Sequence, residues 1–176
     1  MTRNTLQRRI LPPEARPPIG KKRGCRGQTV VEFALVAIPF FFLMFAIIDY
    51  SWALFNQMNV QDAVREAGRY AATGRYVTPT NGAALSRIAS IEQVLNEFAL
   101  GNGANIQSVS ISSVSAGTGT ITTGSAGAPG DTVTITATCA VPMLTNAIGH
   151  FFNADGRYHF TASATFKNEP FPASGD

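Results

Sequence analysis

The feature that most restricts how this chain folds is an uninterrupted apolar run near its beginning. From Phe33 to Ile48, sixteen consecutive residues carry no charge, and the three residues before them extend the segment to nineteen. That length is close to the lower limit for a helix that crosses a bilayer. The run contains three adjacent phenylalanines and no polar side chain, whereas a helix on the surface of a soluble core keeps a polar face. We therefore expect a transmembrane helix over residues 28–49.

The charges on either side of this run predict its orientation. Residues 1–27 hold eight arginines and lysines against the single acid Glu14, a net charge of +7. Since the whole chain carries +3, residues 28–176 carry −4. By the positive-inside rule, the basic leader stays in the cytoplasm and the remainder is exported. The segment after the run, DYSWALFNQ, lacks a small-residue cleavage site, so we expect the span to stay attached.

A basic tail also raises the alternative of nucleic-acid binding. Residues 1–27 contain no aromatic side chain on which a base would stack, and they lead directly into the apolar run. Single-stranded nucleic acids are usually held by basic grooves with interleaved aromatic residues. We therefore expect no nucleic-acid partner.

Three residues in and after the run have structural consequences of their own. Pro39 has no N–H to donate to the carbonyl of Leu35, so the helix should bend or loosen by one turn there. Asp49 and Tyr50, followed by Trp52, mark the outer membrane boundary, where aromatic rings favour the interface. A docking patch for another membrane helix is an alternative interpretation of the same residues.

Glu32 places a carboxylate at the start of the apolar run, where a charged group requires a partner. An unpaired acid costs about 2.5–3.5 kcal/mol at the centre of a bilayer and less toward the surface. One explanation places Glu32 in the headgroup region beside Arg26. The other requires cleavage after Gly27, because the new ammonium group of Gln28 would then lie one helical turn from Glu32.

At this point the residues resemble a known family. A basic leader, Gly27, then Glu32 at the fifth and Phe33 at the sixth position after the cut resemble the processing site of type IV prepilins. Residues 26–73 more specifically resemble the TadE-like pseudopilins of the tight-adherence (Tad/Flp) pilus system. The matching features are the opening RG-x-x-x-VEFALV, the proline in the span, the acid–aromatic pair Asp49 and Tyr50, and the closing R-E-A-x-R-Y-A-A.

The resemblance implies a function in pilus assembly and surface attachment. A prepilin peptidase would cut between Gly27 and Gln28, with Glu32 and Phe33 as part of the processing signal. Glu32, Pro39, Asp49 and Tyr50 would act in assembly. The implied partners are the prepilin peptidase, the Flp major pilin, a TadF-like pseudopilin, the Tad assembly platform with its ATPase, and membrane lipid. The protein would cross the bacterial inner membrane once, with its C-terminal domain in the periplasm or incorporated into an extracellular pilus.

The exported part has the pattern of a pilin-like α+β domain. Residues 50–74 predict a helical stalk, with Ala53, Val60, Val64, Ala67 and Ala71 on one face and Gly74 as C-cap, and residues 82–99 predict a second helix. Residues 131–141 and 157–167 alternate apolar and polar side chains, and residues 106–114 do so more weakly. We expect about three antiparallel strands in a head spanning residues 75–176, with residues 115–130 as a mobile loop or an irregular hairpin.

No constellation of residues predicts catalysis, a metal site or a cofactor. Cys25 and Cys139 lie far apart, so neither a metal-ligand spacing nor an intrachain disulfide is indicated. His159 falls on the polar face of its strand while Cys139 falls on the apolar face of another, which separates them. His150 lies in a connecting segment with no acid nearby. We therefore expect no enzyme.

Two other interpretations remain open beside the pseudopilin. One is an uncleaved single-pass envelope protein whose periplasmic domain binds a partner, and the weaker one is a membrane-tethered enzyme. Cleavage after Gly27 separates the first of these from a pseudopilin, because only a pseudopilin is expected to lose its leader.

Overall fold

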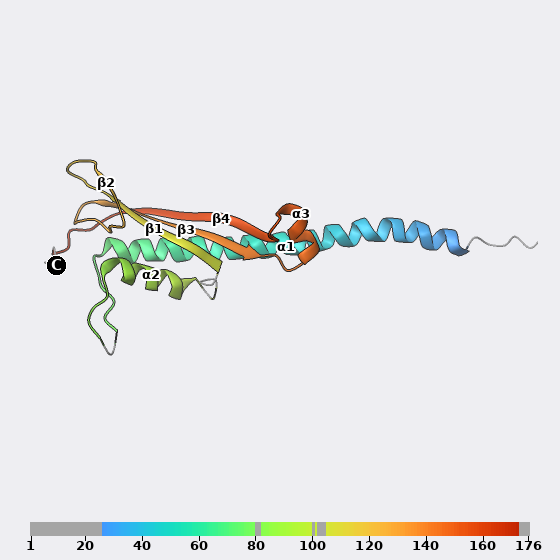
Figure 1. Cartoon of the computed structure of the whole chain (residues 1–176), viewed down its shortest axis with the longest axis horizontal. Helices are drawn as coiled ribbons and strands as arrows, with labels where there is room; N and C mark the ends of the chain where they lie inside the picture. The colour runs from blue at the N-terminus through green and yellow to red at the C-terminus, as the bar shows by residue number, and fades with distance from the viewer. Residues whose placement is uncertain (1–25, 80–81, 100, 102–104, 173–176) are drawn as a thin grey trace, which may run out of the picture. The chain divides into compact units, whose positions relative to one another are not determined.

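The structure, a computed structural model, describes residues 26–79, 82–99, 101 and 105–172. Two helices precede an antiparallel sheet that is interrupted by a short third helix (Figure 1). In chain order the elements are α1 (Arg26–Ala72), α2 (Arg87–Phe98), β1 (Ile106–Val114), β2 (Ile121–Thr123), β3 (Thr132–Pro142), α3 (Asn146–Phe152) and β4 (Arg157–Lys167). This order confirms the expected α+β fold with a long N-terminal helix. Residues 1–25 of the predicted leader lie outside the described residues.

α1 begins as an apolar helix and becomes amphipathic in its second half. The face predicted to be buried is at most 1% exposed at every position, namely Ala53, Val60, Val64, Ala67 and Ala71. Its small and β-branched side chains let the sheet approach the helix closely. The helix ends at Ala72, and Gly74 follows in the left-handed conformation with φ 68°. The amide of Gly74 donates to the Ala71 carbonyl at 3.2 Å, so Gly74 satisfies a carbonyl at the helix end, as predicted.

α2 begins later than the predicted segment 82–99 because Ser86 caps it. The hydroxyl oxygen of Ser86 accepts a hydrogen bond from the amide of Ala89 at 3.2 Å, which satisfies one of the free donors of the first turn. Ile91 and Leu95 are fully buried, whereas Phe98 is 49% exposed. The apolar stripe therefore faces the core over the middle of α2 and leaves it at the end.

The sheet has the strand order β2-β1-β3-β4, and all neighbours are antiparallel. β3 and β4 pair along their whole length, from Thr132 opposite Lys167 to Pro142 opposite Arg157. The alternation predicted for β3 is confirmed, since every second side chain is at most 1% exposed: Val133, Ile135, Ala137, Cys139 and Val141. On β4, Phe160 and Ala162 are buried on the same face.

Two elements differ from the sequence-based expectation. The sheet has four strands rather than about three, because β2 adds a short strand within the predicted loop 115–130. All three residues of β2 are exposed, so it carries no burial pattern that alternation would detect. The segment between β3 and β4 contains the helix α3, where only a connection was expected. His150 lies on this helix.

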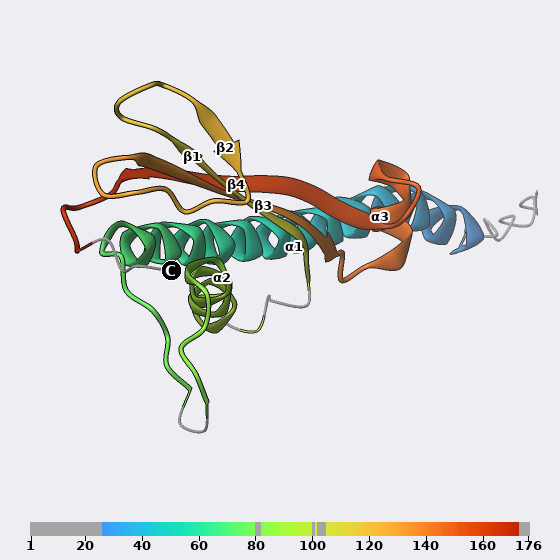
Figure 2. The ribbon, with the colours of Figure 1, turned by 60° about the vertical axis from the view of Figure 1, so that its left-hand side comes forward.

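The core is formed between the sheet and the pair α1 and α2. Figure 2 shows the sheet along the second half of α1, with α2 beside that helix. The buried cluster draws on both helices and on β1, β3 and β4. The chain divides into two compact units, one ending at Ile38 and the other beginning at Pro39. The core lies entirely in the second unit.

Candidate membrane and assembly surface

The first turns of α1 carry the predicted processing signal. Nothing lies within 4 Å of the position that a Cβ would occupy at Gly27, so a larger side chain meets no obstacle there. The side-chain Nε2 of Gln28 donates to Oε1 of Glu32 at 3.0 Å. This contact shows that position 28 reaches Glu32 across one helical turn. Phe33 is 72% exposed.

The apolar run of α1 is largely exposed to solvent in the isolated chain. Every residue from Gly27 to Ile48 is exposed except Ala37 and Ala46, which are partly buried. α1 is long and apolar enough to cross a membrane. An exposed apolar surface of this extent is typical of a membrane or protein contact, so the first half of α1 fits a single membrane span.

Pro39 lies inside α1, where it removes one helical hydrogen bond. The boundary between the two compact units falls directly before it. The helix continues past the proline, so this residue interrupts the hydrogen-bond ladder without ending the element. Its predicted part in assembly stays a prediction.

Asp49 is completely buried although it follows the apolar run. Its two carboxylate oxygens lie 3.0 and 3.2 Å from the backbone nitrogen of Thr145, which donates to them. Thr145 is the N-cap residue of α3, and its own side chain makes no capping bond. Asp49 therefore supplies from α1 the acceptor and the negative charge that favour the start of a helix.

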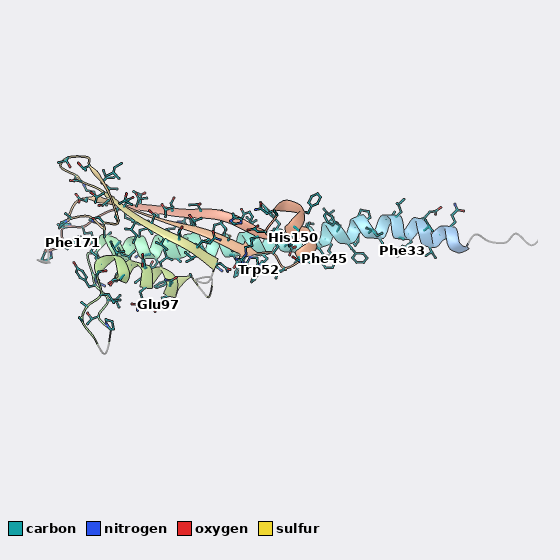
Figure 3. The ribbon with its side chains drawn as sticks, viewed as in Figure 1. Phe33, Phe45, Trp52, Glu97, His150 and Phe171 are labelled. Carbon is teal, nitrogen blue, oxygen red and sulfur yellow. The ribbon has the colours of Figure 1, made fainter. Side chains whose placement is uncertain are left out.

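The aromatic residues beside Asp49 lie on the surface. Tyr50 is 58% exposed and Trp52 is 37% exposed. Trp52 stacks on Phe55 with ring centroids 6.1 Å apart. Figure 3 shows Phe45, Trp52 and His150 at the same end of the sheet. Exposed aromatic rings directly after an apolar span have the chemistry of a membrane–water interface.

The segment from residue 143 to residue 156, which we call the α3 elbow, joins β3 to β4 beside α1. The ring of Phe151 contacts the ring of Phe42 edge-on, with centroids 6.0 Å apart. A Cβ at Gly149 would lie 2.7 Å from the backbone oxygen of Gly156. Only a glycine allows α3 to approach the returning chain this closely. The elbow is thus fixed against the apolar run by Asp49 and Phe42.

A charged face follows on the second half of α1. Arg65 pairs with Asp62 at 3.1 Å, and Arg69 pairs with Glu66 at 3.4 Å. All four side chains are at least 40% exposed. In both pairs the two residues are three positions apart on α1. Such exposed pairs contribute little to stability, so the face remains free to meet another charged surface.

The candidates for catalysis lie apart from one another. Cys139 is buried, and desolvation raises the pKa of its thiol to about 11, so it stays protonated at neutral pH. His159 lies on the exposed face of β4, where its Nε2 is 2.6 Å from Oδ2 of Asp155. Nδ1 of His150 lies 3.0 Å from the carbonyl oxygen of Asn146. Among the described residues, no group of three or more potential metal ligands lies together.

Sequence analysis did not find the α3 elbow or its contact with Asp49. The segment NAIGHFF is too short for helical periodicity to stand out, and Asp49 and Thr145 are 96 positions apart. The local signal for α3 is Thr145, a residue type that favours the N-cap, directly before the short apolar segment.

Comparison with known protein families gives a match to the N-terminal part of the chain. Residues 27–69 match the family model of the TadE-like proteins. This segment contains Gly27, the whole apolar run and the charged face up to Arg69. The match confirms the resemblance of this part of the chain to TadE-like components of Tad pilus systems. No curated protein and no solved structure matches the chain.

Proposed function

We propose that this protein is a minor pseudopilin that takes part in the assembly of a Tad/Flp pilus after cleavage by a prepilin peptidase. The observation that carries the proposal is that the TadE-like match begins at Gly27, the residue before the cut that the resemblance to prepilins implies. The exposed apolar run of α1 supplies the surface on which such a subunit packs against others.

Cleavage would change the electrostatics of the first turn. In the uncut chain the amide of residue 28 is neutral, and Glu32 accepts a hydrogen bond from the side chain of Gln28. Once the bond after Gly27 is cut, the α-amine of Gln28 carries a positive charge at about one helical turn from Glu32. An ion pair at this spacing in a low dielectric offsets the cost of bringing the carboxylate into a membrane or a filament.

The charge distribution supports one orientation, and the TadE-like match supports association with the machinery of a Tad pilus. The +7 leader would stay on the cytoplasmic side of a bacterial inner membrane, and residues from Tyr50 onward would lie in the periplasm. The prepilin peptidase would act on the leader. The Flp major pilin, a TadF-like pseudopilin and the Tad assembly platform would contact α1. In this proposal the protein binds and assembles and does not catalyse a reaction.

The proposal is tested by the N-terminus of the protein isolated from membranes of cells with an active prepilin peptidase. We expect Gln28 as the first residue. Gly27→Ala should abolish processing, and since position 27 is open, this variant removes the cleavage signal without disturbing the fold. Thiol counting in denaturant gives a second readout, because cleavage removes Cys25 and leaves only Cys139.

A second experiment separates the charge of the new α-amine from the Gln28 side chain. Glu32→Ala should permit processing but impair incorporation into pili, and Glu32→Gln should behave in the same way because it removes only the charge. Gln28→Ala should assemble, since it removes the side-chain bond to Glu32 and keeps the α-amine. If Gln28→Ala assembles as poorly as Glu32→Gln, the ammonium is not the partner of Glu32.

Retention of the leader would favour the interpretation as an uncleaved envelope protein. A membrane form that still begins before Gly27 and contains two thiols excludes the pseudopilin. The protein would then be an uncleaved single-pass envelope protein whose exported domain binds a partner.

A further inference from the structure

A cavity of about 660 Å³ lies between the outer end of the apolar run and the start of β4. Its volume falls within the range of about 300–1,000 Å³ that is usual for small-molecule sites. One wall is formed by a single face of α1 that includes Ala46 and Ile47. The α3 elbow closes one side with Met143, and β4 contributes Arg157, Tyr158 and His159.

The cavity lies at the outer boundary of the predicted span. Ala46 and Ile47 belong to the last turn of the apolar run, just before Asp49. The contact between Phe151 and Phe42 places the elbow alongside the same run, at ring centroids 6.0 Å apart. Phe151 is 73% exposed. Where α1 crosses a bilayer, the apolar wall of the cavity is therefore continuous with the outer leaflet.

The β4 side of the cavity carries a cation, Arg157. The guanidinium group of Arg157 makes one long hydrogen bond, from Nη1 to the Ala140 carbonyl at 3.4 Å. No ion pair to Arg157 is formed by the part of the chain that the structure describes. His159 differs in this respect, because Asp155 already holds its ring. Arg157 is thus a cation with donors available in the lining of a largely apolar cavity, and guanidinium groups bind phosphate in bidentate geometry.

We propose that this cavity binds one phospholipid molecule of the outer leaflet, with acyl chain against Ala46 and Ile47 and phosphate at Arg157. The wall combines apolar residues of the span with one cation, the two features that bind the acyl chain and the phosphate of a phospholipid. The proposal requires only that α1 crosses a membrane. It does not depend on cleavage or on pilus assembly, so it stands or fails separately from the proposed function.

The width of the cavity favours an acyl chain over a helix of another subunit, which is about 10–12 Å across with its side chains. The width of the cavity is held on one side by Tyr158, whose hydroxyl donates to Oε1 of Gln57 on α1 at 3.2 Å. This bond resists the separation of β4 from α1 that a helix would require.

The test is native mass spectrometry of the full chain in non-ionic detergent, titrated with phosphatidylglycerol. We expect saturable binding of one phospholipid per chain. Ala46→Phe, which fills the cavity from the α1 side, should abolish this adduct. Arg157→Gln should weaken binding about tenfold or more, as expected for the loss of hydrogen bonds from a charged group. Arg157→Lys should retain part of the affinity, because lysine keeps the charge but cannot form the bidentate hydrogen bonds of a guanidinium group.

Arg75→Gln is the matched control, since it removes the same charge from an exposed residue that does not line the cavity. It should bind phosphatidylglycerol like the unaltered protein. Equal binding by Arg157→Gln and Arg75→Gln would overturn the proposal, as would non-saturable binding or the absence of any adduct. Should Ala46→Phe fail to fold by circular dichroism, the comparison of the two arginine variants still decides.

Discussion

Gly68 of α1 packs closely against Phe166 of β4, and a single methyl group tests this packing. An alanine Cβ at position 68 would lie 2.4 Å from two ring carbons of Phe166. Carbon atoms in contact are normally about 3.5–4.0 Å apart, so Gly68→Ala is too close by roughly 1 Å. The partly buried ring belongs to the rim of the core, so moving it away from the helix gives up part of its packing.

Two opposing effects decide the sign of the change in stability. In a helix interior, replacing glycine by alanine normally stabilises the fold by about 0.8–1 kcal/mol. Forcing an extra carbon into a packed core costs about 1–3 kcal/mol. With two ring atoms in conflict, we expect the cost to exceed the gain, so that Gly68→Ala lowers the free energy of unfolding by about 1 kcal/mol.

The sign should reverse once the ring is removed. In the Phe166→Val background, Gly68→Ala meets no ring and should stabilise the head by about 0.5–1 kcal/mol. The measurement is urea-induced unfolding of the full chain in non-ionic detergent, with pulse proteolysis reporting the folded fraction of the head. Stabilisation by Gly68→Ala in the unaltered background would refute the close contact between Gly68 and Phe166.

Three further predictions follow from buried or hydrogen-bonded groups. Backbone N–H donors hold the pKa of Asp131 below its usual value. The contribution of Asp131 to stability is therefore complete above about pH 4 and is lost as the pH falls through the lowered pKa. Asp131→Asn should reduce the pH dependence of the free energy of unfolding, measured with urea between about pH 5 and 2. Asp49→Ala leaves the amide of Thr145 without its acceptor, and should speed hydrogen exchange there, whereas Asp49→Asn keeps one oxygen and should have a smaller effect. Because burial raises the pKa of Cys139 to about 11, iodoacetamide at pH 8 should label Cys139 only after the head unfolds. Labelling of Cys139 in the native protein, located by peptide mapping, would contradict its burial.

Local patterns predicted those elements whose burial repeats along the chain. The buried side of α1 and the inner face of β3 were assigned correctly, because an apolar residue at every third or fourth position, or at every second, has few other solutions. The same reasoning missed β2 and α3. β2 has no buried side chain, and it exists because its backbone completes hydrogen bonds with β1. α3 has seven residues, which is slightly less than two helical turns and too short for a helical period to be recognised.

The sequence by itself therefore determined that α1 has an apolar half suited to a membrane and an amphipathic half suited to a core. It also determined the charge asymmetry and the TadE-like segment, since all of these are properties of neighbouring residues. Only the tertiary structure decided what Asp49 and Gly68 contact, because their partners Thr145 and Phe166 are about a hundred positions away. A cavity between α1 and β4 likewise has no signature in either segment alone, because it is defined by the distance that folding sets between them.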